Sequence, residues 1–204
     1  MIVYVESNFV LEMAFRQEQA ESCRRVLALC ATGRAKLVLP AFSVAEAFQA
    51  FVARATARNQ AARDLRLQLD QLARSETLAD EAEPLRRLTG LLVRSAEEER
   101  TGLQAAMQEI LDAAELIPLD ADVVREAGRI EASLGLSPQD AIVLASVLKH
   151  LNAIQPEKSC FLNRNTKDFD NPDVVTRLQD LGCRLLPRFD TGLDYIEAET
   201  ALDR

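Results

Sequence analysis

The chain has 204 residues, of which 48% are hydrophobic and 27% are charged, and its formal net charge is −8 at pH 7. This size suits one domain, and the acidic balance excludes a protein that coats nucleic acid non-specifically. No apolar stretch approaches the ~18 residues that a membrane helix needs, and the first residues lack the basic lead-in of a signal peptide. We therefore expect a cytoplasmic protein with no membrane association.

The first elements follow a strand, helix, strand order. Ile2–Val5 is a short run rich in β-branched residues, which fits a strand buried on both faces of a parallel sheet. Helical periodicity follows over Phe9–Phe15 and Glu18–Ala31. Lys36–Leu39 predicts a second strand, which Pro40 ends.

A long helical region then interrupts this order. From residue 43 to 115 the chain consists almost entirely of helix formers, and Pro84 is its only proline. A helix from Ser43 to Arg74 would be ~48 Å long at 1.5 Å per residue. We predict a helical hairpin that projects from the core, its helices covered by each other or by a second copy of the chain. One apolar stripe of this hairpin comprises Phe48, Phe51, Val52 and Ala55.

The first half of this hairpin is basic. The segment from Arg54 to Arg74 contains five arginines and two aspartates, so its formal charge is +3. Arg54 and Arg58 are four residues apart and share a helix face. This pair is interpreted either as a phosphate-binding site or as an ordinary solvated face.

The remaining elements return to the alternating order. They are a third strand or connector at Leu116–Leu119, a helix at Asp122–Leu134 closed by Gly135, a helix at Pro138–Leu151, a strand at Ser159–Leu162, a helix from Asn171-Pro172 to Gly182, and a strand at Arg184–Leu186. Strands that alternate with helices predict an α/β fold with a mainly parallel sheet.

Cysteine and histidine usage limits the kinds of site. The four cysteines, Cys23, Cys30, Cys160 and Cys183, form no C-x-x-C pair, and we expect reduced, structural thiols without a zinc knuckle. His150 is the only histidine. A histidine-rich zinc site is thereby excluded, and we expect His150 near the exposed end of a helix.

Four short polar motifs lie next to predicted strands. Their acidic residues are Glu6 directly after the first strand, Glu46 in Ser-Val-Ala-Glu, Asp140 in Ser-Pro-Gln-Asp, and Asp168 in Asn-Arg-Asn-Thr-Lys-Asp-Phe. A carboxylate at the end of an apolar strand is costly unless a positive charge lies beside it. Several such carboxylates from distant parts of one chain suggest a shared divalent cation.

Each motif also has a purely structural interpretation. Ser43 and Glu46 fit a capping box at the start of a helix, and Ser137 with Asp140 fits a similar cap with Pro138 in the first turn. Asp168 fits a polar turn. The two interpretations are compatible, because the positive potential at a helix N-terminus keeps nearby carboxylates ionised.

Taken in order, the motifs resemble those of the PIN domain, a family of metal-dependent nucleases. Val-Glu6-Ser-Asn-Phe-Val-Leu is similar to the family's first acidic motif, and Pro-Ala-Phe-Ser-Val-Ala-Glu46 is similar to its second. Asp140-Ala-Ile-Val-Leu-Ala resembles the third. Leu-Asn163-Arg-Asn165-Thr-Lys-Asp168-Phe resembles the fourth.

The resemblance implies a three-layer α/β/α fold, which we assign to one domain over residues 1–204 with a helical insertion at about 50–115. It also implies a Mg²⁺- or Mn²⁺-dependent endoribonuclease, similar to the PIN toxins of bacterial toxin–antitoxin systems. Catalysis is expected from the acids of the four motifs, which are Glu6, Glu46, Asp140 and Asp168. Asn165 is expected to join these four as a metal ligand, with Asn8 and Asn163 in support.

The departures from the family pattern leave other functions open. Position 6 is Glu where Asp is usual, position 163 is Asn where Thr or Ser is typical, and Asn165 replaces a frequent Asp. The long hairpin also exceeds the compact toxins. One alternative is a catalytically weak or inactive module for binding or oligomerisation, and another is a structure-specific DNA nuclease. The partners considered are RNA, a second copy of the chain, and an antitoxin or other protein.

Overall fold

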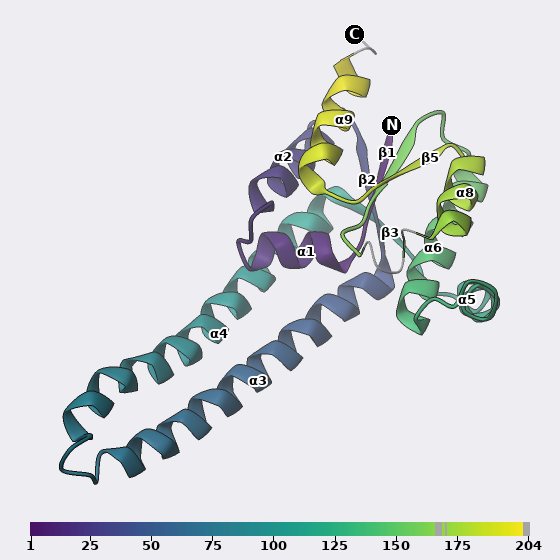
Figure 1. The fold of residues 1–204 in the computed structure, drawn as a ribbon. Helices are drawn as coiled ribbons and strands as arrows, with labels where there is room; N and C mark the ends of the chain where they lie inside the picture. The colour runs from purple at the N-terminus through teal and green to yellow at the C-terminus, as the bar shows by residue number, and fades with distance from the viewer. Residues whose placement is uncertain (166–168, 170, 202–204) are drawn as a thin grey trace.

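In a computed structural model that describes residues 1–165, 169 and 171–201, a parallel sheet forms the centre of the molecule (Figure 1). Within these residues its strands are β1 (Ile2–Val5), β2 (Lys36–Pro40), β3 (Ala114–Ile117), β4 (Ser159–Leu162) and β5 (Cys183–Leu186). Their order is β3-β2-β1-β4-β5, and every adjacent pair is parallel. The prediction of a mainly parallel sheet is confirmed.

Helices cover both faces of this sheet and complete the predicted three layers. They are α1 (Ser7–Ala14), α2 (Ala20–Ala31), α3 (Ala41–Leu72), α4 (Ala79–Ala113), α5 (Ala121–Leu134), α6 (Pro138–Ile154), α8 (Pro172–Asp180) and α9 (Phe189–Ala201). Alternate residues of each interior strand face opposite layers. Val3 and Val5 of β1 pack with α1, α2, α9 and the base of the hairpin, whereas Ile2 and Tyr4 pack with α5, α6 and α8.

The third strand lies two residues earlier than expected. β3 occupies Ala114–Ile117 and pairs with β2 from Ala114 opposite Leu37 to Ile117 opposite Pro40. It is an edge strand, and Glu115 and Leu116 are exposed. An edge strand lacks the continuous apolar run that identifies the buried strands. The sequence pattern therefore does not locate the ends of β3, which are set by its pairing with β2.

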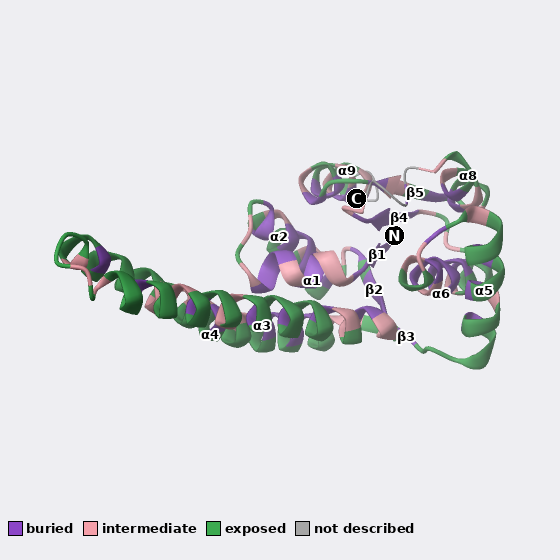
Figure 2. Ribbon diagram, turned by 60° about the horizontal axis from the view of Figure 1, so that its bottom comes forward, coloured by how far each residue is buried: buried purple, intermediate pink, exposed green. Residues whose placement is uncertain are grey.

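The long helical region forms a hairpin that projects from the sheet (Figures 1 and 2). α3 has 32 residues and α4 has 35. Ala55, Ala62 and Leu69 of α3 are buried and recur every seven residues, as expected for a helix whose seam lies against a partner helix. The two helices therefore cover each other. The division into one domain with an insertion at about 50–115 stays a prediction.

The apolar stripe expected at the start of this hairpin is divided between two environments. Phe51 and Ala55 are buried, but Phe48 is 43% exposed and Val52 is 58% exposed. Leu85 and Leu88 of α4 are also exposed. Among the helices described, none is both long enough and apolar enough to cross a membrane.

Gly102 fixes the close approach of α4 to α1. A Cβ atom at this position would lie 2.2 Å from the backbone oxygen of Ala14. Alanine in an open helix is about 1 kcal/mol more favourable than glycine, but overpacking costs about 1–3 kcal/mol. We expect Gly102→Ala to lower the free energy of unfolding in urea by about 2 kcal/mol.

Gly90, in the same helix, provides the matched control. A Cβ atom there would meet only the Arg94 side chain, at 3.4 Å. Gly90→Ala should therefore stabilise the protein slightly. Equal stability of the Gly102→Ala and Gly90→Ala variants would contradict the close contact between α1 and α4.

The single histidine and the cysteines have structural environments. His150 lies near the end of α6 as expected, but its side chain is only 10% exposed, because its Nδ1 forms a 2.8 Å hydrogen bond with the Tyr4 hydroxyl. The side chain is enclosed although it lies near the helix end, because the buried Tyr4 hydroxyl needs a polar partner. The four cysteines are buried free thiols, as expected.

Candidate functional site

Glu6 immediately follows β1 and caps the N-terminus of α1. Its Oε2 accepts hydrogen bonds from the Ser7 hydroxyl at 2.8 Å and from the Asn8 backbone N–H at 3.0 Å. Its Oε1 is buried and has no hydrogen-bond partner among the described residues. Burial raises the pKa of this carboxyl group, the bonds from Asn8 and Ser7 oppose that rise, and the charge of Asp140 adds to it.

Glu46 lies in the second turn of α3, and the capping box expected there is wrong. The helix begins at Ala41 with Pro40 as its cap residue, so Ser43 already lies inside the first turn and cannot cap it. The Ser43 hydroxyl and Glu46 Oε2 are both buried without a hydrogen-bond partner among the described residues. Capping therefore does not account for Glu46.

The environment of Glu46 raises its pKa to about 7. Burial is the largest cause, followed by the negative charges of Glu6 and Asp140. The nearby hydroxyls of Ser43 and Ser7 lower the pKa slightly, although no hydrogen bond of ordinary geometry joins Ser43 to Glu46. The negative charges of Glu6 and Asp140, which help to keep the proton on Glu46, are also charges that a bound cation would neutralise.

Asp140 combines the capping role with contact to the fourth motif. Ser137 is the N-cap of α6, and its hydroxyl accepts from the Asp140 backbone N–H at 3.1 Å and donates to Asp140 Oδ2 at 2.6 Å. Asp140 Oδ1 accepts from Asn165 Nδ2 at 3.0 Å. The predicted cap is confirmed, and the carboxylate is also directed toward the segment after β4.

The fourth motif is held by its two asparagines. Asn163 is 2% exposed, and its side-chain oxygen accepts from the Asn165 backbone N–H at 2.7 Å. This turn presents the Asn165 amide group to Asp140. Asp168, the remaining predicted residue of the motif, lies outside the described residues.

Glu6, Glu46 and Asp140 converge at the carboxyl edge of the sheet. They are close enough for the charges of Glu6 and Asp140 to raise the pKa of Glu46. This arrangement follows from the topology. β1 lies between β2 and β4, and the three strands are parallel, so the segments that follow them start at the same edge of the sheet. Ligands commonly bind at this edge in α/β proteins.

The donor atoms of this carboxylate cluster fit a hard divalent cation. Carboxylate oxygens are the ligands that Mg²⁺ and related ions prefer, and Oε1 of Glu6 and Oε2 of Glu46 are buried with no hydrogen-bond partner in the part of the chain that the structure describes. Among the described residues, however, no three His, Cys, Asp or Glu side chains are arranged as a ready-made metal site. The carboxylates repel one another when no cation is bound, and Asp168 is not described.

A comparison with known families matches residues 3–169 to the PIN domain. The chain belongs to the PIN domain family. Members of this family are generally nucleases. The matched part of this PIN domain contains Glu6, Glu46, Asp140 and Asn165.

Two further comparisons complete the description. The PIN domain is similar to a chain in the crystal structure of VapBC2 from Rickettsia felis bound to a DNA fragment from their promoter, at 10% sequence identity and a TM-score of 0.45. The similarity covers 91% of this chain and 99% of that chain. No curated protein matches. The family assignment therefore depends on the match over residues 3–169.

The two arginines singled out in the PIN domain's hairpin differ in their surroundings. Arg58 Nη1 lies 2.6 Å from Glu99 Oε2 and 3.3 Å from the Ser95 hydroxyl, so α4 holds it. Arg54 Nε lies 3.7 Å from Glu99, and its guanidinium carbon lies 4.7 Å from the Phe15 ring centroid. Only Arg54 of this pair lines a pocket beside the carboxylate cluster.

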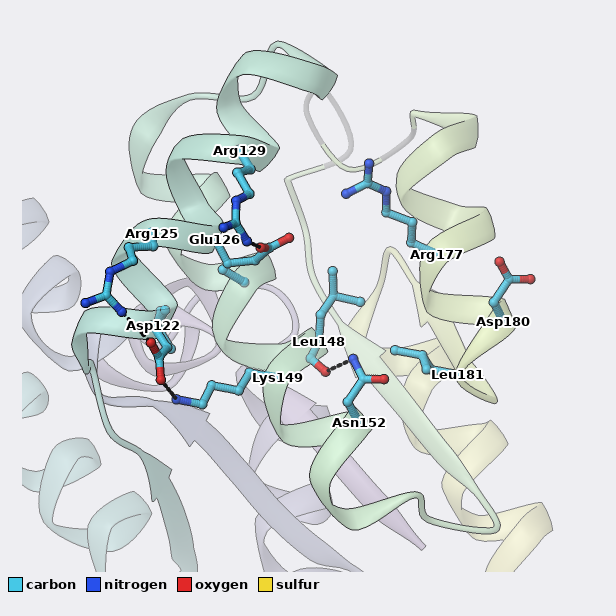
Figure 3. Close-up of a pocket in the computed structure, with 12 residues that line it drawn as sticks. Asp122, Arg125, Glu126, Arg129, Leu148, Lys149, Asn152, Arg177, Asp180 and Leu181 are labelled. Atoms are coloured by element: carbon cyan, nitrogen blue, oxygen red, sulfur yellow. Dashed lines mark hydrogen bonds and ion pairs between the residues drawn. The ribbon is translucent and has the colours of Figure 1, made fainter.

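Another pocket of about 670 Å³ lies between α5, α6 and α8 (Figure 3). Its charged side chains are largely paired, with Arg125 Nη1 2.5 Å from Asp122 and Arg129 Nη1 2.9 Å from Glu126. None of the predicted site residues that the structure describes lines it. We therefore do not assign the nuclease site to this pocket.

Sequence reasoning missed a buried ion pair beside the site. Glu12 of α1 is 1% exposed and forms an ion pair with Arg164, which lies between the two asparagines of the fourth motif. Glu12 Oε1 also accepts from the Gln19 backbone N–H at 2.5 Å. The one available signal was a charged residue within the apolar run Phe9–Phe15, since a buried charge requires a partner.

The raised pKa of Glu46 predicts the stability of the protein in EDTA as a function of pH. The unfolded chain releases this proton near pH 4.5, whereas the folded protein keeps it to about pH 7. The contribution to stability is therefore fully present below about pH 4.5 and is lost as the pH rises through about 7. We expect the urea midpoint to fall between pH 5 and 8, and Glu46→Gln to flatten that decline. The same decline in both proteins would show that Glu46 titrates normally.

Proposed function

We propose that this PIN domain is a metal-dependent endoribonuclease that hydrolyses phosphodiester bonds in RNA. The observation that carries the proposal is the convergence of Glu6, Glu46 and Asp140, which come from distant parts of the chain. Oxygen atoms buried without partners are costly to keep in a fold. A bound Mg²⁺ or Mn²⁺ ion would supply the missing partner of these buried oxygen atoms.

Each residue has a role in this proposal. Glu6, Glu46 and Asp140 would hold the cation with Asn165 as a further ligand, and the 3.0 Å hydrogen bond from Asn165 Nδ2 would also orient the Asp140 carboxylate. Asp168 completes the set by family resemblance. A bound divalent cation supplies a Lewis acid and activates water. In the reaction, the water oxygen bonds to phosphorus as the bond from phosphorus to the sugar oxygen breaks, and the proton that the water loses is taken up by the departing sugar oxygen.

Cleavage assays with purified protein test the proposal. Single-stranded RNA, single-stranded DNA and branched DNA should be incubated in EDTA, in Mg²⁺ and in Mn²⁺. We expect RNA cleavage only with a divalent cation. Cleavage confined to branched DNA would favour the structure-specific DNA nuclease instead, and metal-independent cleavage would overturn the assignment of the carboxylates.

A second function, as a binding or assembly module, is favoured by two observations. Among the described residues no three-ligand metal site is preformed, and the hairpin exposes large apolar side chains such as Leu67, Leu85 and Leu91. Calorimetric titration with Mn²⁺ separates the two functions, because a scaffold need bind no ion at Glu46. A homodimer, an antitoxin partner and a cytoplasmic location stay predictions. Light scattering of the purified chain would test the homodimer.

A further inference from the structure

A polar pocket of about 550 Å³ adjoins the carboxylate cluster. It lies where α1, the first part of α3 and the segment after β4 meet. The residues that matter for its chemistry are Asn8, Glu12, Gln17, Arg54, Arg164 and Asn165. Two arginines thus face one polar hollow from parts of the chain that are 110 residues apart (164 − 54).

The pocket and the carboxylate cluster share a wall. The Asn8 backbone N–H donates to Glu6 Oε2, and Asn165 Nδ2 donates to Asp140 Oδ1. Both asparagines also line the pocket. A polymer whose reacting group lies at the carboxylates would therefore have its next segment in contact with the two arginines.

The Arg54 guanidinium is held in place by uncharged and charged neighbours. It lies over the Phe15 ring, with 4.7 Å from its carbon to the ring centroid. When the Gln17 amide is oriented to satisfy its hydrogen bonds, its oxygen accepts from Arg54 Nη1 at 3.3 Å. Glu99 lies 3.7 Å from Nε. These contacts orient the group, while its side chain remains 42% exposed toward solvent.

The Arg164 guanidinium is anchored on one side. Its ion pair with Glu12 is made through Nη1, and Glu18 lies 4.0 Å from the same atom. A guanidinium carries five N–H donors in a planar fork, which suits binding of a second anion. The side chain is 35% exposed. Glu12 is itself occupied by the Gln19 N–H and by Gln17.

We infer that Arg54 and Arg164 form a phosphate subsite that holds the backbone of the RNA strand next to the bond to be cleaved. The inference rests on the proposed nuclease function and names its contact with the substrate. A protein of net charge −8 repels a polyanion overall, so an RNA strand would be held where local cations face it. Arginine is the residue best matched to phosphate geometry.

Binding of a fluorescent single-stranded RNA in EDTA tests this subsite without cleavage. Anisotropy should be measured over a series of NaCl concentrations for the wild type, Arg54→Ala, Arg164→Lys and Arg58→Ala. We expect Arg54→Ala to weaken binding roughly tenfold, as for loss of one charge-assisted hydrogen bond. The slope of log K against log [NaCl] should become shallower by about 0.7, as for loss of one contact to a single strand.

Arg58→Ala is the matched control. It removes the same charge from a residue one helical turn further along α3, which Glu99 holds and which does not line the pocket. It should leave the slope unchanged. Arg164→Lys keeps a cation for Glu12 but removes the planar fork, so it should weaken binding without unfolding the protein. Circular dichroism would verify that each variant is folded.

The outcomes separate the subsite from the nuclease proposal. A wild-type slope for Arg54→Ala, equal effects of Arg54→Ala and Arg58→Ala, or no binding of RNA by the wild type would each overturn the subsite. RNA cleavage with Mn²⁺ in any of those cases would leave the nuclease assignment intact. Arg54-dependent binding without cleavage would support the subsite and remove the nuclease.

Discussion

Glu46→Gln should reduce Mn²⁺-dependent RNA cleavage at least roughly 100-fold. Substitution of residues that only support metal ligands already lowers metal affinity or activity about 10- to 100-fold, and Glu46 is proposed as a ligand itself. Glutamine keeps the size of the side chain and removes the negative charge that a divalent cation requires. Initial rates on single-stranded RNA at saturating Mn²⁺ measure the effect. Calorimetry on the same samples should show weaker Mn²⁺ binding.

The raised pKa of Glu46 makes this substitution unusually informative. Burial and the charges of Glu6 and Asp140 already favour the neutral form of the residue, so glutamine should not destabilise the fold at neutral pH. Loss of activity in a protein of equal or higher stability then points to the site itself. Retention of cleavage within about threefold of the wild type would remove Glu46 from the mechanism.

Asp64→Asn is a suitable control for this experiment. Asp64 is also an acid of α3, but it is exposed and accepts a hydrogen bond from Gln60 on the hairpin. Its neutralisation should leave cleavage unchanged. Asp140→Asn is the second test, and we expect a loss similar to that of Glu46→Gln. An effect of Asp64→Asn as large as theirs would indicate that total charge, rather than the cluster, controls activity.

The convergence of the acids could be predicted from sequence because it depends on local signals and one topological rule. Apolar runs identified β1, β2 and β4, and polar residues followed each run. Parallel strands bring their carboxyl ends to one edge. Val5 of β1 pairs with Leu162 of β4, so Glu6 and Asn163, which follow them directly, lie at the same edge of the sheet.

The start of α3 shows where local signals mislead. Ser43 and Glu46 have the spacing of a capping box, but the helix begins at Ala41, immediately after β2 ends. The tight connection from strand to helix decided the boundary, and it moved both side chains inside the helix. The change matters for function, because a Glu46 that reached back to cap the helix would be turned away from Glu6.

Contacts between distant segments were beyond sequence reasoning. Arg54 and Arg58 share a helix face, yet Glu99 holds Arg58 more closely because the register of α4 against α3 places it there. Small residues such as Ala62 are buried along the seam between the two helices. A helical pattern gives the face of each helix but not the offset between two of them.

Arg164→Ala is expected to lower the free energy of unfolding by about 3 kcal/mol, the lower end of the cost of breaking a buried ion pair. The estimate is at the lower end because Arg164 is 35% exposed, so water can replace it partly. Glu12, by contrast, is 1% exposed and would keep a buried charge with fewer partners. Urea unfolding at pH 7 measures the change.

A double-mutant cycle shows whether the cost comes from the stranded carboxylate. Glu12→Gln in the Arg164→Ala background should recover part of the lost stability, because it removes the unpaired charge and keeps an acceptor for the Gln19 N–H. Arg129→Ala breaks an exposed pair with Glu126 and should cost less than about 1 kcal/mol. If Arg164→Ala cost no more than Arg129→Ala, the Glu12–Arg164 pair would not hold the segment that carries Asn163 and Asn165, and the geometry around Asp140 would need another support.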